Sequence, residues 1–411
     1  MSASPVDLFG FGARGQALAG ALGADAEGFE GVYYNQAGLA FARRPSFSLG
    51  YQSASFDRRY GVGDAALAAS PTRDAPALSI GFGVPLAFGG ALKDRLAIGL
   101  GFTIPQTSIL IADIARPGEP SFVVLENRAQ TVSIQASLGI RISDAFAVGI
   151  GTIALAELAG EIAVLPNESG RIGSRVKDEL VADYALVAGV VGRFLPFATG
   201  RGTRHGLSLA LTYRSESRAE FDLPITADLG ESFNIPIPNL TVHGIAQYDP
   251  AELSFEVAVT PVEAVAISAG ITWEQWSTYP LPIAYAAVPA GTPPQPLPDF
   301  NDTWAMKLGV EGTLAIGDLT LRPRAGFAFE PSPTPEQVGF HNHLDGDRMI
   351  LGVGLGLRWG QFRLDLAGQV HDVAEHTSTK VEGTPTTNLG APSITSTGHI
   401  LFGSIELGVE L

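Results

Sequence analysis

The chain has 411 residues, of which 45% are hydrophobic and only 17% charged, and its mean hydropathy is positive. Its formal net charge of −16 argues against nucleic-acid binding, which depends on clustered lysine and arginine. Cysteine is absent, which excludes disulfides, thiol nucleophiles and cysteine-ligated metals. No stretch of about 18 apolar residues lacks both charge and proline, as a transmembrane helix would require. Apolar residues dispersed on alternate positions are instead typical of a membrane β-barrel.

The first long segment, residues 10–40, is rich in alanine and glycine and has helix-like runs. It contains a GxGxxG pattern at Gly10, Gly12 and Gly15, but only nine residues precede it and no parallel-strand pattern follows. We therefore interpret these glycines as small residues that let a plug pack closely, and not as a dinucleotide site. The chain is divided into an N-terminal hatch, residues 1–44, and a barrel, residues 45–411.

The first five residues, Met1 to Pro5, have neither the basic nor the apolar region of a signal peptide. A cytosolic protein and a mature outer-membrane chain would both fit that start. The strand pattern in the rest of the chain favours the mature outer-membrane chain.

Alternation of apolar and polar residues dominates the rest of the chain, and residues 351–359 show it best, with Leu351, Val353 and Leu355 separated by glycines. We predict fourteen such strands. They start near Ser46, Ala77, Arg95, Arg128, Ala145, Asp178, His205, Ala251, Ala264, Asp302, Leu319, Asp347, Gln361 and Thr397.

Short and long connections alternate strictly between these strands, as the two rims of an up-and-down barrel require. The seven long connections are 57–76, 105–127, 160–177, 222–250, 280–301, 331–346 and 372–396. The sequence therefore predicts an all-β fold: a 14-stranded antiparallel transmembrane β-barrel with seven long extracellular loops and a small helical hatch in its lumen. A soluble β-sandwich is the alternative that alternation alone leaves open.

The loop after the third strand is unusually apolar for an extracellular loop. It contains Ile109, Leu110, Ile111 and Ile114, and Phe122 follows. An exposed cluster of this kind is typical of a binding or membrane-contacting surface, and burial under neighbouring loops is an equal alternative.

Other motifs have simpler interpretations. His341 and His343, with Asp345 nearby, resemble a metal site, but we interpret them as solvated loop residues, and no metal, cofactor or catalytic residue is predicted. Trp273 and Trp276 are explained by an interfacial aromatic girdle, with a ligand wall as the alternative.

Arginines expected to face the lumen provide a second set of polar candidates. They are Arg141, Arg358 and Arg363. We expect them to pair with Asp365 and Glu406 and so to hold the plug, a structural role.

Three motifs in chain order resemble the FadL/TodX family of outer-membrane transporters for fatty acids and hydrocarbons. The hatch segment Asn35-Gln36-Ala37-Gly38-Leu39 is similar to the family's Asn-Pro-Ala-Gly-Leu element, with Gln36 in place of proline. The other two are Phe300-Asn301-Asp302-Thr303-Trp304, followed by residues 324–335, and Asp345-Gly346-Asp347-Arg348.

The resemblance implies capture of a ligand in a hydrophobic extracellular groove, transfer to an internal pocket, and release by hatch rearrangement or through an opening in the wall. In the family that opening lies at a kinked third strand, and Ile104-Pro105 interrupts the third strand here. Some fatty-acid members have a lysine where this chain has Asn301, so neutral hydrocarbons or other apolar molecules become better candidates than carboxylates.

These expectations describe a non-enzymatic outer-membrane channel for passive uptake of hydrophobic small molecules. Capture is assigned to Ile109, Leu110, Ile111, Ile114 and Phe122, the inner pocket to Phe29, Val32 and Tyr33, and the gate to Asn35, Gln36, Ala37, Gly38 and Leu39. The expected partners are the ligand, membrane lipid, lipopolysaccharide and the outer-membrane assembly machinery, on which the apolar C-terminal Leu411 would dock. The alternative is a barrel that serves as an assembly, secretion or anchoring partner without transport. A porin for polar solutes is a third interpretation.

Overall fold

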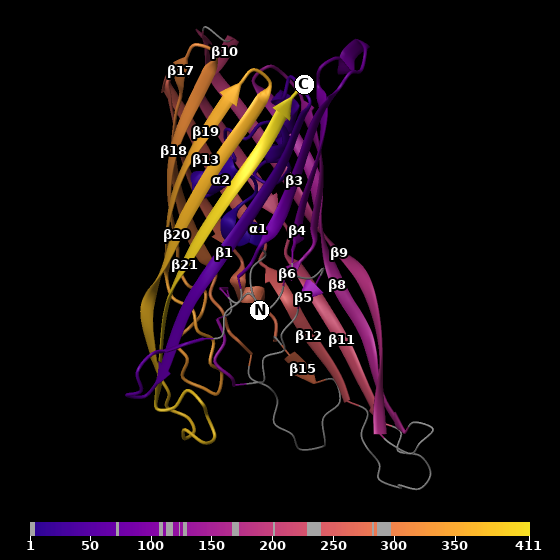
Figure 1. The fold of residues 1–411 in the computed structure, drawn as a ribbon, viewed down its shortest axis with the longest axis vertical. Helices are drawn as coiled ribbons and strands as arrows, with labels where there is room; N and C mark the ends of the chain where they lie inside the picture. The colour runs from indigo at the N-terminus through magenta and orange to yellow at the C-terminus, as the bar shows by residue number, and fades with distance from the viewer. Residues whose placement is uncertain are drawn as a thin grey trace.

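The computed structural model describes residues 5–70, 74–106, 110–111, 118–122, 124–125, 130–166, 172–199, 202–227, 240–281, 283–285 and 297–411. Within them, fourteen strands close into one antiparallel barrel, since β1 pairs with both β3 and the last strand, β21 (Figure 1). The barrel strands are β1 (Ser46–Val62), β3 (Ala77–Leu86), β4 (Leu96–Pro105), β7 (Ser133–Arg141), β8 (Phe146–Pro166), β9 (Ile172–Thr199), β10 (Gly202–Arg214), β13 (Glu252–Val262), β14 (Val265–Glu274), β16 (Thr303–Gly312), β18 (Leu319–Glu330), β19 (Arg348–Trp359), β20 (Phe362–Thr379) and β21 (Ser393–Glu410). The predicted fold class is confirmed.

The period-two pattern places apolar side chains on the outer wall. On β19, Leu351 and Val353 are 59% and 63% exposed, whereas Arg348, Ile350 and Gly352 between and beside them are buried against the lumen. On β16 the outward series is Trp304, Met306, Leu308 and Val310. An apolar exterior with a polar interior is the arrangement that a lipid bilayer stabilises. No helix among the described residues combines the length and apolar character needed to cross a membrane.

Among the described residues, seven further strands lie outside the barrel circuit. They are β2 (Ala68–Ala69), β5 (Leu110–Ile111), β6 (Gln130–Thr131), β11 (Ser217–Ala227), β12 (Leu240–Asp249), β15 (Ile283–Tyr285) and β17 (Leu314–Ile316). β5 pairs with β6 in a separate two-stranded sheet, so part of the apolar loop is itself a hairpin. The short 3₁₀ helices η3 (Gly90–Leu92) and η4 (Trp276–Thr278) lie in connections between strands.

The prediction of a long loop at residues 160–177 is wrong. β8 and β9 continue their antiparallel ladder to the pair Pro166 and Ile172, and β11 adds to the edge of β8 in parallel, with Phe221 opposite Leu158. Because β11 gives this edge of the hairpin a backbone partner, the hairpin continues as a sheet past the level where β7 ends. In Figure 1, β8, β9, β11 and β12 extend together beyond the barrel on the side of the long loops.

The N-terminal residues lie inside the barrel as short helices: α1 (Pro5–Phe9), α2 (Ala13–Ala17), η1 (Gly28–Val32) and η2 (Gln36–Phe41) (Figure 1). Glycines of the wall let the hatch backbone approach closely. A Cβ added to Gly352 of β19 would lie 2.7 Å from the carbonyl oxygen of Ala17, and one on Gly139 of β7 would lie 2.8 Å from the backbone nitrogen of Ala40. We propose that the hatch comprises residues 1–44 and the barrel residues 45–411.

Candidate functional site

The gate residues predicted from the sequence are Asn35 and the first four residues of η2, and all of them are buried. Asn35 begins η2: its Oδ1 accepts a hydrogen bond from the backbone nitrogen of Ala37 at 3.0 Å, and its Nδ2 donates to Thr212 Oγ1 of β10 at 2.9 Å. Gln36 Nε2 donates to the Val32 carbonyl at 2.9 Å. Polar bonds therefore join η2 both to η1 and to the barrel wall. Whether this segment acts as the gate stays a prediction.

Of the three residues assigned to an inner pocket, only Tyr33 lines the cavity described below, and the assignment of all three stays a prediction. Phe29 packs edge-on against Phe11 within the hatch, with ring centroids 6.0 Å apart, and Val32 packs with Leu39 against the wall. Tyr33 instead lines a cavity between the hatch and the inner faces of several strands. Phe29 and Val32 thus belong to the packing of the hatch itself.

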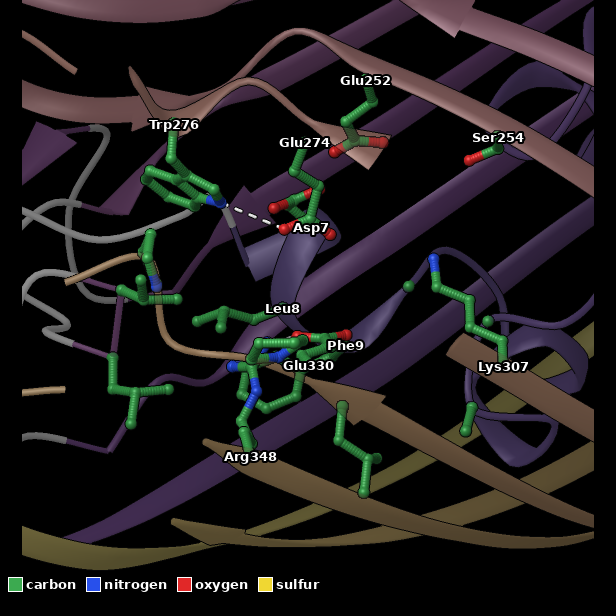
Figure 2. Close-up of a pocket in the computed structure, with 18 of the residues that line it drawn as sticks. Asp7, Leu8, Phe9, Glu252, Ser254, Glu274, Trp276, Lys307, Glu330 and Arg348 are labelled. Atoms are coloured by element: carbon green, nitrogen blue, oxygen red, sulfur yellow. Dashed lines mark hydrogen bonds and ion pairs between the residues drawn. The ribbon is translucent and has the colours of Figure 1, made fainter. Parts of the chain in front are cut away.

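This cavity is lined by both aromatic and charged side chains (Figure 2). Phe9 and Tyr33 of the hatch and Trp276 of η4 supply aromatic surface. Arg214 of β10 lies over the Tyr33 ring at 4.3 Å and forms ion pairs with Glu252 at 3.2 Å and Asp7 at 3.3 Å. The cavity is therefore amphipathic: it offers stacking surfaces together with fixed charges.

The two tryptophans predicted to form a girdle lie in different environments. Trp273 lies opposite Trp304, whose side chain is 53% exposed on the outer wall, which fits a girdle. Trp276 is buried, donates from Nε1 to Glu274 at 3.0 Å and lines the cavity. For Trp276 the girdle interpretation is wrong, because the chain turns inward at η4 after β14 ends.

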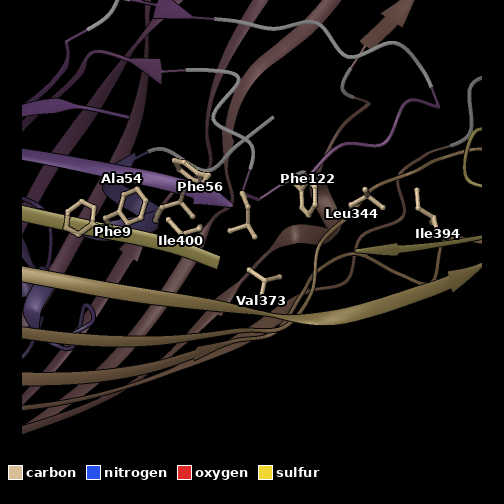
Figure 3. Packing of buried hydrophobic residues seen from close by; sticks show 11 residues of the cluster. Phe9, Ala54, Phe56, Phe122, Leu344, Val373, Ile394 and Ile400 are labelled. Atoms are coloured by element: carbon tan, nitrogen blue, oxygen red, sulfur yellow. The ribbon is translucent and has the colours of Figure 1, made fainter. Parts of the chain in front are cut away.

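An apolar cluster connects the hatch with the long loops (Figure 3). Phe9 of α1 stacks on Phe402 at 4.5 Å and meets Phe56 edge-on at 6.3 Å. The members of the apolar cluster are Leu8, Phe9, Ala54, Phe56, Phe122, Leu125, Leu344, Val373, Ile394, Ile400 and Phe402. The cluster forms a continuous apolar core from the loop containing Phe122 down to the first helix of the hatch.

Phe122 lies inside this cluster and is only 1% exposed, and the guanidinium of Arg58 lies 5.2 Å from its ring centroid. Of the two alternatives for the apolar loop, burial under neighbouring loops therefore holds for Phe122. Leu110 and Ile111 form β5, and Ile109 and Ile114 lie outside the described residues. Capture by these residues stays a prediction.

The third barrel strand, β4, keeps its pairing with β3 through Ile104 and Pro105 without a register shift. On its other edge the ladder with β7 ends at the pair Thr103 and Ser133, two residues before Pro105. The wall thus loses one of its two ladders beside Ile104 and Pro105. A ligand exit at this position stays a prediction.

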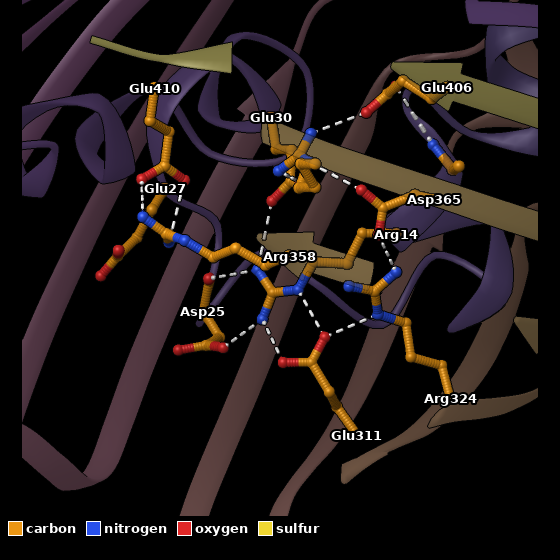
Figure 4. Close-up of polar contacts among 12 residues, drawn as sticks. Arg14, Asp25, Glu27, Glu30, Glu311, Arg324, Arg358, Asp365, Glu406 and Glu410 are labelled. Carbon is orange, nitrogen blue, oxygen red and sulfur yellow. Dashed lines mark hydrogen bonds and ion pairs between the residues drawn. The ribbon is translucent and has the colours of Figure 1, made fainter. Parts of the chain in front are cut away.

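Three arginines, Arg14 and Arg324, which are buried, and Arg363, which is half-buried, connect the hatch to the wall through carboxylates (Figure 4). Arg14 of α2 contacts Glu311 of β16 at 2.9 Å, Glu30 of η1 at 3.1 Å and Asp25 at 2.6 Å. Burial alone would lower the pKa of Arg14, but these carboxylates outweigh burial and raise that pKa well above its usual value. Arg14 therefore stays charged and holds three acidic groups together.

The network continues along the wall. Arg324 of β18 joins Glu311 at 2.7 Å to Asp365 at 2.5 Å. Arg363 pairs with Asp365 and with Glu406, each at 2.7 Å, as the sequence predicted. The other two candidate arginines lie elsewhere: Arg358 pairs with Glu410, and Arg141 donates to the Asp94 carbonyl.

The sequence reasoning missed Arg14, Glu311 and Arg324 as anchors of the hatch, and Glu252 and Lys307 as cavity residues. The available signal was charge on the polar face of predicted strands: Glu252 and Glu256, and Lys307 and Glu311, recur at even spacings along β13 and β16. A lumen filled by a plug makes such charges partners of the plug.

The loop between β18 and β19 is packed, not solvated as predicted. His343 is 6% exposed, its ring stacks on His341 at 4.9 Å and meets Phe300 edge-on at 5.5 Å. The backbone nitrogen of Leu344 donates to the Ser121 carbonyl at 2.6 Å, so this loop also holds the loop that carries Phe122. We call residues 331–347 the lid. Among the described residues, no group of three His, Cys, Asp or Glu side chains could hold a metal.

We expect the lid to loosen as the pH falls from about 6.5 toward 3. Burial, and then the neighbouring His341 and Lys380, lower the pKa of His343 to about 3. His343 binds a proton more readily when the lid is unpacked. The packed lid is therefore most stable above pH 6.5, and its stability falls by up to about 1.4 kcal/mol per pH unit below that value. Hydrogen exchange of residues 331–347 at pH 7.5, 6, 5 and 4 measures this effect.

His343→Asn should remove the dependence on pH, and His399→Asn, at a histidine that is 60% exposed, serves as the matched control. A wild-type lid whose protection does not change between pH 7.5 and 4 would contradict the role of His343.

Proteins of one family resemble this chain over nearly its whole length. The family model described as outer membrane protein transport protein (OMPP1/FadL/TodX) matches residues 6–397. No curated protein matches the chain. A FadL homologue of Pseudomonas aeruginosa is similar in structure, with a TM-score of 0.66 and 16% identity over 97% of this chain and 98% of that one. The toluene transporter TodX of P. putida has a TM-score of 0.59 and 14% identity, covering 98% and 99%. The toluene transporter TbuX of Ralstonia pickettii has a TM-score of 0.53 and 16% identity, also covering 98% and 99%.

Proposed function

The chain belongs to the OMPP1/FadL/TodX family of outer membrane transport proteins, and from this we propose that it is a passive channel for hydrophobic small molecules such as hydrocarbons, fatty acids or similar apolar compounds. The family consists of transport channels and not of enzymes. TodX and TbuX are named as toluene transporters, and toluene is the substrate of those two proteins by name.

The observation that carries the proposal is the continuous apolar cluster that joins the long loops to the hatch. It begins under the loops at Phe122 and Leu344 and reaches Phe9 of the hatch. An apolar molecule that enters beside it exchanges water for apolar contact, which contributes about 25 cal/mol per Å² of buried apolar surface. A polar solute gains nothing there.

The steps we propose are capture at the loop that contains Leu110 and Phe122, passage along the apolar cluster, and release when the hatch rearranges or when the wall opens beside Ile104 and Pro105. The end of the β4–β7 ladder before Pro105 supports the second exit. The buried hydrogen bonds by which Asn35 and Gln36 hold η2 to the wall and to η1 support η2 as the part of the hatch that changes for the first exit.

Uptake of a radiolabelled hydrocarbon by cells that express the protein tests the proposal. Leu110→Asp should lower the initial rate several-fold, because a charge in the capture loop opposes binding of an apolar molecule. Leu389→Asp is the matched control, since Leu389 is 52% exposed in the connection between β20 and β21.

Equal uptake by wild type and L110D would remove the capture assignment. Equal uptake by cells with and without the protein would overturn the proposed function itself.

A further inference from the structure

The cavity beside Tyr33 has a charge pattern that transport of a plain hydrocarbon does not use. Six carboxylates and three cationic side chains line it. The carboxylates belong to Asp7, Glu252, Glu256, Glu274, Glu330 and Asp345, and the cations to Arg214, Lys307 and Arg348. A purely apolar ligand would meet all of these groups without compensating for any of them.

The carboxylates of the cavity have donors from the protein. Glu256 accepts from the backbone nitrogen of Gly23 at 2.7 Å. Glu274 accepts from Trp276 Nε1 at 3.0 Å and from Thr303 Oγ1 at 2.9 Å. Glu252 is paired with Arg214, and Glu330 with Arg348. The four glutamates of the cavity are thus served by hatch and wall.

The donors are not. Arg348 of β19 is 5% exposed, and its Nη1 has no hydrogen-bond partner among the described residues. Arg214 is 8% exposed, and its Nε also has no hydrogen-bond partner among the described residues. Lys307 of β16 forms no hydrogen bond or ion pair within the described part of the chain, and Figure 2 shows its side chain beside the cavity. Buried donors such as these two arginine nitrogens need an acceptor, and Lys307, which is half-buried, brings a third donor to the cavity.

We infer that this cavity binds neutral apolar molecules that carry a hydrogen-bond acceptor, such as the oxygen of a ketone, ester or ether. The inference rests on the proposed function and narrows its substrate class. The acceptor oxygen meets Arg348 and Lys307, which reach the cavity from different strands, while the apolar part of the molecule lies against Phe9, Tyr33 and Trp276.

The charge balance decides between a neutral acceptor and a carboxylate. Carboxylates outnumber cations in the cavity by two to one. A ligand carboxylate would meet this excess at short range in a partly desolvated space, where like charges repel strongly. A cationic ligand would match the excess charge but would leave the donors of Arg348 and Arg214 without partners. A neutral acceptor satisfies the donors and adds no charge.

Equilibrium dialysis of a matched C8 series tests the inference: octane, 2-octanone, octanoate and octylammonium, each carbon-14 labelled, with the full chain in lipid nanodiscs and empty nanodiscs as the partitioning blank. We expect 2-octanone to bind roughly tenfold tighter than the other three, the ratio typical of one hydrogen bond to a charged donor. Lys307→Met should reduce this preference, and so should Arg348→Met combined with Glu330→Gln, which avoids a buried unpaired carboxylate. Lys93→Met, at an exposed lysine of the rim, should leave it unchanged.

Preference for 2-octanone that disappears in both variants supports the inference. Equal binding of 2-octanone and octane, or tightest binding of octanoate or octylammonium, overturns it while leaving the proposed function in place. Binding of none of the four compounds above the blank would overturn both.

Discussion

A disulfide formed between A21C and G309C is expected to reduce uptake at least tenfold, and reduction of the disulfide is expected to restore it. Ala21 belongs to the hatch and Gly309 to β16 of the wall, and a Cβ on Gly309 would lie 3.3 Å from the Cβ of Ala21. Disulfides join Cβ atoms about 3.5–4.5 Å apart, so a small adjustment permits the bond. The chain has no other cysteine to compete for it.

The reason for so large an effect is that the hatch fills the lumen. Leu18 lies within 3.3 Å of the same Cβ position and Ala17 contacts β19, so this part of the hatch already lies against the wall. A covalent bond at residue 21 would prevent the segment between α2 and η1 from leaving β16. If release requires rearrangement of the hatch, a hatch that cannot leave the wall blocks release.

Initial uptake rates of a labelled hydrocarbon, before and after addition of a reducing agent, provide the measurement. The single variants A21C and G309C control for the added side chains, and non-reducing electrophoresis reports the fraction of cross-linked protein. Full uptake by fully cross-linked protein would show that the hatch stays in place during transport, and it would leave the wall beside Pro105 as the exit.

The barrel could be predicted from the sequence because each strand reports its own environment. Lipid outside and a polar lumen inside impose a period of two on every strand, as Leu351 and Val353 against Gly352 illustrate. The extension of β8 and β9 could not be predicted in the same way. It is paired with β11, which follows on the far side of β10 in the sequence, and such a parallel partner has no local signal.

For the hatch, too, the sequence predicted the element but not the contacts that hold it. The alanines and glycines of residues 10–40 predicted a plug, but the bonds that hold the plug join residues far apart in the chain. Arg14 and Glu311 are separated by 297 positions. Alternation indicates that Glu311 faces the lumen, and it cannot indicate which hatch residue meets it there. For Phe122, composition left exposure and burial equally open, and only the packing of distant loops decided between them.

Arg14→Met is expected to release the hatch without unfolding the barrel. Arg14 contacts Glu311, Glu30 and Asp25, and the side chains of Glu311 and Glu30 are only 3% and 2% exposed. Removing the cation takes one cationic partner from each of these buried carboxylates, and the loss of a partner at a buried site costs up to about 3–5 kcal/mol. Glu311 keeps Arg324 at 2.7 Å, whereas Glu30 keeps only the longer contact with Arg363 at 3.7 Å, so the cost is borne mainly by Glu30 and the hatch. The wall is held by continuous strand ladders, which the substitution does not touch.

Hydrogen exchange across residues 5–41 measures the loosening of the hatch, and planar-bilayer conductance measures the opening that results. Arg358→Met is the matched control: its pair with Glu410 lies at the rim, with side chains 34% and 31% exposed, and such pairs contribute about 1 kcal/mol or less. The double variant R14M/E30Q should recover part of the protection, because it removes the buried carboxylate that depends most on Arg14.

Two outcomes separate the forces that hold the hatch. Rapid exchange in R14M with an intact barrel would mean that the ion network outweighs apolar packing, so that any ligand-driven release must first weaken these pairs. Wild-type exchange and no added conductance in R14M would mean that packing of Phe11, Phe29, Leu18 and Leu22 is sufficient. In that case an apolar ligand could compete directly for the same contacts, and the route to release would begin at Phe9.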